Sequence, residues 1–236
     1  MNSKTVLFKE NEKKNEVKKM FDSIAPKYDF LNRLLSAGID NYWRKKTLKL
    51  ADANENTILF DVACGTGDVA IMARKLGVKN IFGADFSHNM LSLFEVKSEW
   101  IKGKDIQIAA ENIPVKDESF TLITVAFGVR NFYDIPAAFK EFQRVLKPGG
   151  KSAILEFRMP SNPVVKALYI FYFKNILPFF GKLISGHPTA YKYLPDSVED
   201  FDKNVDLVKL FKEAGFTKAQ RHSLTFGIAQ VVIAEK

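Results

Sequence analysis

Two glycines and two acids mark a stretch of the chain that could bind a cofactor. Asp61 is followed by Gly65 and Gly67 at G-x-G spacing, and Asp85 comes later in the chain. Because glycine has no Cβ, the backbone at Gly65 and Gly67 can adopt positive φ and let a ligand approach closely. An acid about 20 residues beyond such a turn is placed to accept hydrogen bonds from the two hydroxyls of a ribose. The alternative for Asp85 is a strand-end acid that only caps the next helix.

The glycine turn joins a predicted strand to a predicted helix. Residues 58–62 are mostly apolar, as in a buried strand, and residues 69–76 are amphipathic. The amino end of that helix presents free N–H groups and the positive end of its dipole to the turn. The turn lacks the third glycine of a dinucleotide loop and the lysine of a P-loop. The pattern D-x-x-x-G-x-G resembles instead the first motif of class I S-adenosylmethionine (SAM) methyltransferases, and a purely structural tight turn is the alternative.

Strands and helices are expected to alternate along most of the chain. We expect strands at 57–62, 79–85, 105–109, 119–127, 151–157, 216–224 and 226–234. We expect helices at 66–76, 88–101, 134–146 and 196–214, the third of them stopped by the Lys-Pro-Gly-Gly run at 147–150. This order predicts an α/β fold for residues 51–236, with a Rossmann-like, doubly wound sheet of seven strands that ends in a closing strand pair.

Two further segments flank or interrupt this pattern. Residues 1–50 are expected to form helices, with a break at Gly38, that either cover the mouth of the cofactor site or cap one sheet edge. An insertion at about 158–195 is expected to form a lid. Its aromatic part, 164–183, is either a core helix or a surface helix that receives a lipidic substrate and contacts a membrane.

Composition narrows the class of protein. The chain has 236 residues and a formal net charge of +8, but its lysines are dispersed and no RNA-binding motif is present, so we expect no nucleic-acid partner. The single cysteine, Cys64, is expected to be a small packed residue rather than a nucleophile. His88, His187 and His222 are scattered, and we expect no metal site. The start of the chain has no apolar segment like that of a signal peptide and no run is long enough to span a bilayer, so a cytoplasmic protein is expected.

Longer blocks of sequence carry a more specific signal. They lie at 17–32, 36–44, 61–68, 84–91, 127–132, 144–150, 155–157 and 191–197. The most specific are F-D-x-I-A-x-x-Y-D at 21–29 and F-G-x-R-N at 127–131. With these blocks, the chain resembles the ubiquinone/menaquinone biosynthesis C-methyltransferases (UbiE/MenG type), and the likeness covers residues 17–236.

The resemblance implies an activity and a cofactor. It implies a class I SAM-dependent methyltransferase that transfers the methyl group of SAM to a ring carbon of a polyprenylated quinol, most directly demethylmenaquinol. Alternatives are a polyprenyl benzoquinol, as in ubiquinone biosynthesis, or another small molecule or lipid on the same fold. A nucleic-acid-binding protein and a non-catalytic SAM-fold subunit are competing hypotheses of other classes. The oligomeric state stays open, with a homodimer as one option.

The resemblance also implies positions for the cofactor. Asp61 and the turn residues Gly65, Thr66 and Gly67 bind SAM, Asp85 and Phe86 lie at the ribose, residues 109–111 (Ala109, Ala110 and Glu111) lie at the adenine, and Ala126 lies near the methionine end. Ala109 stands where family members often have Asp or Asn, and Ala126 where some have Ser. Because Ala109 has no side-chain acceptor, we expect backbone groups, Glu111 or Asn112 to replace that contact with the adenine amino group.

Arg130 and Asn131 are the main candidates for the chemistry. The ring carbon of a quinol becomes a good nucleophile when a hydroxyl loses its proton, and a phenolic pKa near ~10 means that this step needs help. We expect Arg130, with Asn131, to bind the quinol oxygen. Tyr28, Asp29 and Tyr193 are second-rank candidates. The alternative for Arg130 is a salt bridge that ties the N-terminal cover down.

Overall fold

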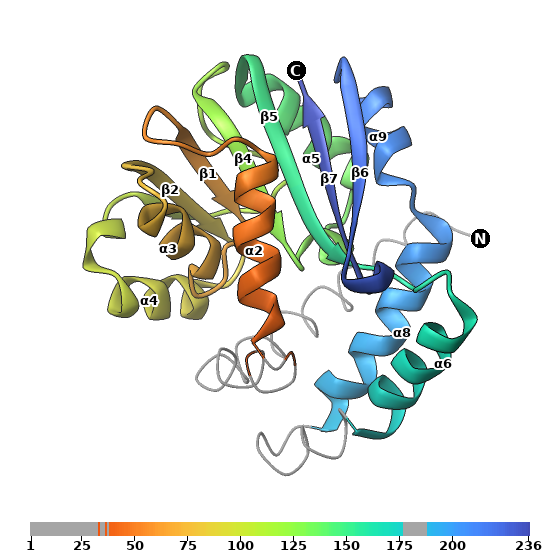
Figure 1. Ribbon diagram of the computed structural model, residues 1–236. Helices are drawn as coiled ribbons and strands as arrows, with labels where there is room; N and C mark the ends of the chain where they lie inside the picture. The colour runs from red at the N-terminus through yellow and green to blue at the C-terminus, as the bar shows by residue number, and fades with distance from the viewer. Residues whose placement is uncertain (1–32, 34–35, 37, 177–187) are drawn as a thin grey trace, which may run out of the picture.

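One mixed sheet organises the part of the chain that can be described. A computed structural model describes residues 33, 36, 38–176 and 188–236, apart from the side chains of residues 174 and 188–195. The strands in these ranges are β1 (Ile58–Val62), β2 (Asn80–Asp85), β3 (Asp105–Gln107), β4 (Phe120–Ala126), β5 (Leu146–Phe157), β6 (Lys218–Leu224) and β7 (Ala229–Glu235). They form a seven-stranded sheet in the order β3-β2-β1-β4-β5-β7-β6 (Figure 1). The strands β1 to β5 run parallel and β7 runs antiparallel to both neighbours, which confirms the predicted α/β sheet with its closing pair.

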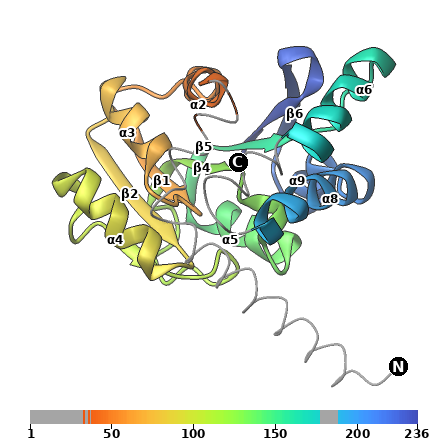
Figure 2. The same ribbon diagram turned by 90° about the horizontal axis from the view of Figure 1, so that it is seen from below.

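Helices cover both faces of the sheet. The helices of the described ranges are α2 (Ile39–Leu50), α3 (Asp68–Lys75), α4 (His88–Lys97), α5 (Ile135–Val145), α6 (Pro163–Phe171), α8 (Pro188–Asn204) and α9 (Leu207–Glu213). Short helical turns are η1 (Glu99–Ile101), η2 (Val129–Asn131), η3 (Tyr172–Ile176) and η4 (Thr225–Gly227). Figure 2 shows α2 and α3 on one side of the sheet and α5 and α9 on the other. Buried apolar side chains fill both layers: Phe94 of α4 packs with α2 and α3, and Phe139 and Phe211 stack between α5 and α9.

The strand order reverses between β1 and β4. Chain connections lead from β1 outward to β2 and β3 and then back across to β4, which pairs with β1 through the register Asp61↔Thr124. At such a reversal the connecting loops diverge and leave a crevice beyond the carboxyl ends of the strands. The helices α6 and α8 lie beyond that same edge, at the lower right of Figure 1.

Two of the expected elements differ most clearly from the structure. The fifth strand begins at Leu146, not at 151: Leu146 pairs with Phe120, the register then shifts, and Lys151 pairs with Leu122. The glycines of this stretch allow the chain to bulge without leaving the sheet, and Gly149 has φ of 73°. The expected helix 196–214 is two helices, α8 and α9, because Asp206 adopts an extended conformation and its side chain caps α9 by accepting from the Val208 N–H.

Most of the expected N-terminal cover lies outside the described residues. The exceptions include α2, which begins after Gly38, as predicted, where φ is 77°. Trp43 of α2 is buried and its Nε1 donates to Thr225 Oγ1 over 2.7 Å, so α2 is fixed to the turn between β6 and β7. Tyr28 and Asp29 lie outside the described residues.

Candidate active site

The glycine turn between β1 and α3 has the backbone conformation that its sequence predicts. Gly65 has φ of 55° and Gly67 has φ of 83°. Gly67 also lies against α4, because a Cβ built on it would come within 2.1 Å of the Phe94 ring. The neighbouring Ala63 has φ of 52°, which is uncommon for a residue with a side chain. The turn is therefore strained and closely packed, as is common at binding sites.

Asp85, at the end of β2, is bonded to the turn. Its Oδ2 accepts from the Gly65 N–H over 2.8 Å and its Oδ1 accepts from the Ser87 N–H over 2.8 Å. The cap of α4 is Ser87, whose side chain accepts from the Met90 N–H, so Asp85 is not the helix cap. Asp85 thus fixes the shape of the turn.

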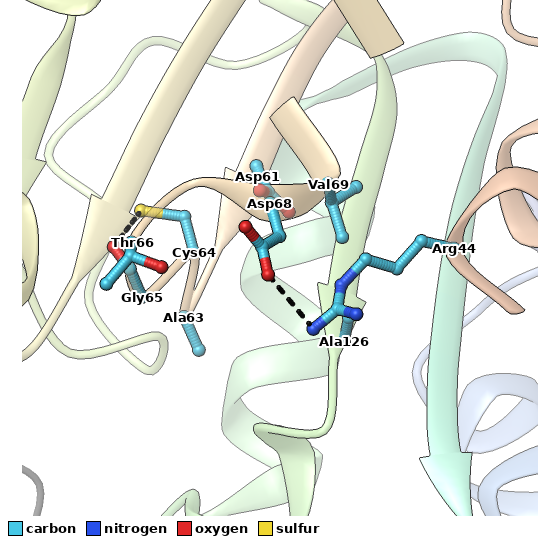
Figure 3. A pocket seen from close by; sticks show the side chains of 9 residues that line it. All are labelled: Arg44, Asp61, Ala63, Cys64, Gly65, Thr66, Asp68, Val69 and Ala126. Atoms are coloured by element: carbon cyan, nitrogen blue, oxygen red, sulfur yellow. Dashed lines mark hydrogen bonds and ion pairs between the residues drawn. The ribbon is translucent and has the colours of Figure 1, made fainter. Parts of the chain in front are cut away.

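A hollow with about 330 Å³ of empty space, open to solvent on one side, lies between the turn, the end of β4 and α2 (Figure 3). Four of the residues expected to bind the cofactor line it: Asp61, Gly65, Thr66 and Ala126. It is also lined by five residues that were not assigned to cofactor binding: Arg44, Ala63, Cys64, Asp68 and Val69. The structure thus joins the turn, the end of the fourth strand and one helix of the cover in a single cavity.

Asp61 contributes a buried carboxyl group to the lining of this hollow. The side chain is buried, its Oδ1 accepts from Thr124 Oγ1 over 2.7 Å, and its Oδ2 has no hydrogen-bond partner among the described residues. Burial raises the pKa of Asp61 to about 7, against the lowering effects of the Thr124 hydrogen bond, of the Ala70 backbone N–H, which is near but forms no hydrogen bond of good geometry with Oδ2, and of Arg44. An unpartnered buried carboxylate oxygen fits a cationic donor such as an ammonium group. The residues present therefore fit a ligand with a charged amino group.

Asp68 joins three elements around the rim of the hollow. Its Oδ1 accepts from Lys97 Nζ over 2.8 Å, and its Oδ2 lies 3.5 Å from Arg44 Nη2. Lys97 Nζ also donates to Thr66 Oγ1 over 3.1 Å, and Arg44 is itself paired with Asp40. Although burial raises it, Arg44 and Lys97 hold the pKa of Asp68 below its usual range. These charges fasten α2, α3 and α4 together, with the Arg44 side chain as one wall of the hollow (Figure 3).

Two of the residues expected at an adenine, Phe86 and Ala109, lie next to the end of β2. The Ile108 N–H donates to the Asp85 carbonyl over 3.1 Å, which brings Ala109 beside β2. The Phe86 ring is exposed and meets the Tyr133 ring edge-on, with centroids 6.1 Å apart. Ala110, in contrast, is buried in the core. Two exposed aromatic rings beside a strand end could flank a flat heterocycle.

Glu111 has a local structural role. Its Oε1 accepts from the Tyr133 N–H over 2.7 Å and from the Asp134 N–H over 3.2 Å. Glu111 therefore holds the loop before α5, and one of its oxygens is already engaged. If Glu111 accepts from the adenine amino group in place of a side chain at position 109, it does so through its other carboxylate oxygen, Oε2.

Arg130 and Asn131 lie in η2, directly after β4. Arg130 Nη1 donates to the Phe127 carbonyl over 2.6 Å and to Glu156 Oε1 over 2.8 Å. The Arg130 side chain is 6% exposed and that of Glu156 is fully buried. Among the described residues, the ion-pair partner of Arg130 is thus a residue of β5, whereas most of the N-terminal cover, to which the alternative assigned this salt bridge, lies outside them. Tyr193 belongs to α8, but its side chain is outside the description.

An aromatic pair lies between Arg44, which lines the hollow, and Arg130. Phe127 and Phe157 lie with ring centroids 4.5 Å apart, and Trp43 packs against both. The Arg44 guanidinium lies 5.6 Å from the Phe127 centroid, and that of Arg130 lies 5.9 Å from the Phe157 centroid. Phe127 has φ of 59° and directly follows Ala126, which lines the hollow. This arrangement places an apolar, aromatic surface between two cationic groups.

The unforeseen residues differ in how visible they are in the sequence. Arg44 and Asp68 fall within motif blocks, and their opposite charges, one in the helix before β1 and one at the start of α3, were a usable signal. Ala63 and Val69 line the hollow because of their position alone. Cys64 is partly exposed, but burial of its thiol raises its pKa well above the usual range, so a packed role agrees with the expectation.

The chain is similar to known proteins along almost its whole length. A model described as the ubiE/COQ5 methyltransferase family matches residues 8–236. The ubiquinone/menaquinone biosynthesis C-methyltransferase UbiE of Geotalea daltonii is 46% identical over 236 residues, which cover 98% of this chain and 100% of that relative. The demethylmenaquinone methyltransferases of Chlorobaculum parvum and Thermus thermophilus are 43% and 40% identical, over 94% and 92% of this chain and 93% and 100% of theirs.

Solved structures share the fold at lower sequence identity. A SAM-dependent methyltransferase from Aquifex aeolicus matches with a TM-score of 0.56 at 18% identity, over 81% of this chain and 88% of that chain. The [4+2]-cyclase SpnF matches with a TM-score of 0.60 at 16% identity, over 93% and 94%. These likenesses confirm the expected class I SAM methyltransferase fold. They say nothing of the reaction, because a methyltransferase and a cyclase share that fold.

Proposed function

Because the chain belongs to the ubiE/COQ5 methyltransferase family, we propose that it transfers the methyl group of SAM to a ring carbon of a polyprenylated quinol. The acceptor that we favour is demethylmenaquinol, and a polyprenyl benzoquinol is the alternative. The observation that carries the proposal is the hollow with its unpartnered Asp61 oxygen, together with the Phe127–Phe157 pair that lies between Arg44 of its lining and Arg130. Cofactor and acceptor sites would then adjoin at the carboxyl ends of β1 and β4.

In this assignment the cofactor lies across the strand ends. Asp61 faces its ammonium group, the turn residues Gly65 to Gly67 approach its methionine part, and Asp85 accepts from its ribose. Phe86 and the 109–111 stretch flank its adenine, with Tyr133 as an additional aromatic neighbour. The sulfonium group supplies an already activated methyl group, so the protein has mainly to align the acceptor and exclude water.

The acceptor ring belongs on the other side of Ala126. Arg130 and Asn131 bind a quinol oxygen, and the Phe127–Phe157 pair offers an apolar surface to the flat ring. A guanidinium beside that oxygen stabilises the negative charge that develops as the hydroxyl loses its proton. Tyr28 and Asp29, which lie outside the described residues, are secondary candidates for binding the acceptor.

The titration of Asp61 leads to a prediction for cofactor binding. With a pKa of about 7 in the ligand-free protein, Asp61 is largely protonated below neutral pH, whereas a bound ammonium group favours the carboxylate. SAM affinity should therefore weaken as pH falls below 7, approaching tenfold per unit, and binding should release a proton. Calorimetry in two buffers of different ionisation enthalpy measures that release. A dissociation constant that does not change between about pH 5.5 and 8 would contradict the role of Asp61.

Asp61→Asn provides the matched variant. It keeps an acceptor for Thr124 but removes the charge, so SAM affinity should fall by roughly 10- to 100-fold and lose its pH dependence. The ligand-free variant should melt at a higher temperature than wild type above neutral pH. The folded carboxylate has the raised pKa, so wild type loses stability as pH rises from 3.8 towards 7, and the amide does not. An unchanged melting temperature together with unchanged affinity would reject this account of Asp61.

We also propose that α6 contacts a lipid surface. No helix within the described ranges has the length and apolarity needed to cross a membrane. Three apolar side chains of α6 nevertheless face solvent: Val164 at 67%, Leu168 at 65% and Phe171 at 58% exposure. They lie on the insertion beyond the strand ends, beside the proposed acceptor site, and a prenyl chain has to leave a membrane to reach that site.

Replacing two of these side chains tests the lipid contact. Leu168→Ser with Phe171→Ser should reduce co-sedimentation with anionic phospholipid vesicles by several-fold and raise KM for a long-chain quinol more than for a short-chain one. Val96→Ser is the matched control, because Val96 is 81% exposed on α4, far from α6 in Figure 1. Equal loss of vesicle binding in the control variant would argue against a specific surface.

A panel of acceptors tests the proposed function. The protein and SAM are incubated with chemically reduced demethylnaphthoquinol, a prenylated benzoquinol lacking the methyl group, and a soluble phenol. Mass spectrometry should find one added CH₂ group on the naphthoquinol and little or none on the other two. A gain on the benzoquinol alone would select the alternative ring, and methylation of the soluble phenol alone would overturn the proposal.

A further inference from the structure

A cluster of buried polar groups beside Arg130 lacks hydrogen-bond partners. Glu156 Oε1 accepts from Arg130 Nη1 over 2.8 Å and from its neighbour, the Phe157 N–H, over 2.9 Å. Glu156 Oε2, Arg130 Nε and the Tyr169 hydroxyl find no partner among the residues that the structure describes. Glu156 is fully buried, and Tyr169 is 6% exposed. Three buried polar atoms that are unpaired in the same region require an explanation, because most such atoms in proteins are bonded.

Three different elements bring this cluster together. Glu156 lies at the end of β5, Arg130 comes from η2 after β4, and Tyr169 belongs to α6 of the insertion. The Arg130 and Glu156 charges both act on the Tyr169 hydroxyl. Tyr169 packs on Phe173 with centroids 4.2 Å apart, and Phe173 meets Phe157 edge-on at 6.0 Å. The cluster therefore borders the aromatic pair that faces the cofactor hollow, and α6 closes it from outside.

The unpaired atoms indicate which chemical group could satisfy their hydrogen bonds. Arg130 Nε and the Tyr169 hydroxyl can donate, while Glu156 Oε2 can only accept when it is ionised. An aromatic hydroxyl accepts from the first two groups and donates to the third. A quinone carbonyl can accept only, so it would leave the Glu156 oxygen unpaired, and such an unpaired buried group costs about 1–3 kcal/mol.

We propose that Glu156 takes the hydroxyl proton of the quinol acceptor, while Arg130 and Tyr169 hold the same oxygen by donating to it. This inference rests on the proposed function and adds the proton acceptor and a second donor to it. Because Tyr169 and Phe173 close the cluster, the acceptor reaches Glu156 when this end of α6 and η3 moves aside. The segment η3 is a π-helix, a form that occurs often at functional sites.

The proton and electron transfers balance without a further reactant. The quinol O–H bond breaks, the proton passes to Glu156 Oε2, and the electron pair stays on the oxygen and feeds into the ring. The ring carbon forms its bond to the methyl group as the methyl–sulfur bond breaks, with that pair of electrons going to sulfur. The same ring carbon then loses its hydrogen as a proton to water, and Glu156 returns its proton to the oxygen.

The charges around Glu156 suit a proton acceptor. Burial raises the pKa of its carboxyl above the usual range, and the Arg130 charge and the backbone N–H groups of Phe157 and Arg130 limit this rise. A base is most effective when its pKa lies near the working pH. Burial likewise raises the pKa of the Tyr169 hydroxyl, which therefore stays a donor. Asp202 of α8, which also acts on Tyr169, is paired with Arg158 at 3.3 Å.

Glu156→Gln is the direct test, with acceptors of graded phenolic acidity. The variant keeps the shape but cannot take a proton, so kcat with an ordinary naphthoquinol should fall by roughly 10²–10⁴-fold. The loss should shrink as pH approaches the phenolic pKa and with halogenated quinols of lower pKa, while SAM affinity stays unchanged. Glu141→Gln is the control, because Glu141 forms a similar pair with Arg144, 2.7 Å apart, away from the site. A loss that is equal for all acceptors and pH values, or no loss, would overturn the role of Glu156.

A second variant, Tyr169→Phe, tests the proposal even if Glu156→Gln does not fold. A binding measurement tests it without relying on turnover. Thermal shifts are compared for the methylated product quinol and its dimethyl ether. Wild type should be stabilised by the quinol and hardly by the ether, and Tyr169→Phe should lose much of that difference and about tenfold in kcat. Equal shifts in wild type would overturn the hydroxyl site. If wild type methylates no quinol at all, the proposed function fails as well, whereas methylation with unaffected variants contradicts only this inference.

Discussion

Arg130→Ala is expected to reduce kcat by roughly 10²–10³-fold while SAM binds with nearly its wild-type affinity. Within the described part of the chain, the Arg130 guanidinium donates to the Phe127 carbonyl and to Glu156, and neither residue lines the hollow. The variant also leaves the fully buried Glu156 without its counter-charge. The free energy of unfolding should therefore drop by about 3–5 kcal/mol. Turnover and calorimetric SAM binding, measured below the lowered melting temperature, separate the two effects.

Two further variants serve as comparisons for Arg130→Ala. Arg221→Ala removes an arginine that pairs with Asp206 at 2.8 Å, but this pair is largely exposed, so stability should change by about 0–1 kcal/mol and turnover not at all. Arg130→Lys keeps the charge and should recover most of the stability but little of the turnover, since an ammonium group cannot bond two partners in the fork geometry of a guanidinium. If SAM affinity fell as much as kcat in Arg130→Ala, Arg130 would be a structural residue and not an acceptor-binding one.

Gly67→Ala should have the second large effect, on folding and cofactor binding together. The new Cβ would lie 2.1 Å from the Phe94 ring, and φ at Gly67 is 83°. Overpacking of a core costs about 1–3 kcal/mol. The left-handed conformation adds about 1–2 kcal/mol for a residue with a Cβ. We therefore expect a strongly lowered melting temperature and a large loss of SAM affinity, because the turn has to move away from α4.

A second-site change and a control separate the clash from the backbone strain. Phe94→Leu shortens the facing side chain, so the double variant should recover part of the affinity relative to Gly67→Ala alone. Gly103→Ala is the control, since Gly103 has φ of 74° but nothing within 4 Å of a built Cβ. Gly103→Ala should lose only the stability that the left-handed backbone conformation costs a residue with a Cβ. Equal destabilisation at positions 67 and 103, with no recovery in the double variant, would mean that packing against Phe94 does not fix the turn.

The cofactor half of the site could be predicted from sequence because its signals are local. The run from Ile58 to Asp68 contains the strand, the turn and the first residue of the helix, and positive φ at both glycines follows from their lack of a Cβ. The β-bulge at the start of β5 could not be predicted in this way. Pro148 and the two glycines after it have the composition of a helix stop, and only pairing with β4 keeps them in the sheet.

The acceptor half depends on contacts between distant segments. Arg130 stands out in its motif, but its partner Glu156 is 26 residues away and is selected by the pairing of β4 with β5. Tyr169 was visible only as one of many aromatic residues of the insertion. Its buried hydroxyl becomes informative once the fold places it beside two charges. Sequence patterns identified the residue types, and the tertiary structure decides which of them share a site.

The fate of the methyl group tests the central claim most directly. The protein is incubated with SAM that carries an isotope-labelled methyl group and with short-chain demethylmenaquinol, and the product is examined by NMR. The account predicts that the label appears as a methyl group on a ring carbon, with both hydroxyls intact. A labelled methoxy group, or no label on the quinol while SAM is bound, would contradict it.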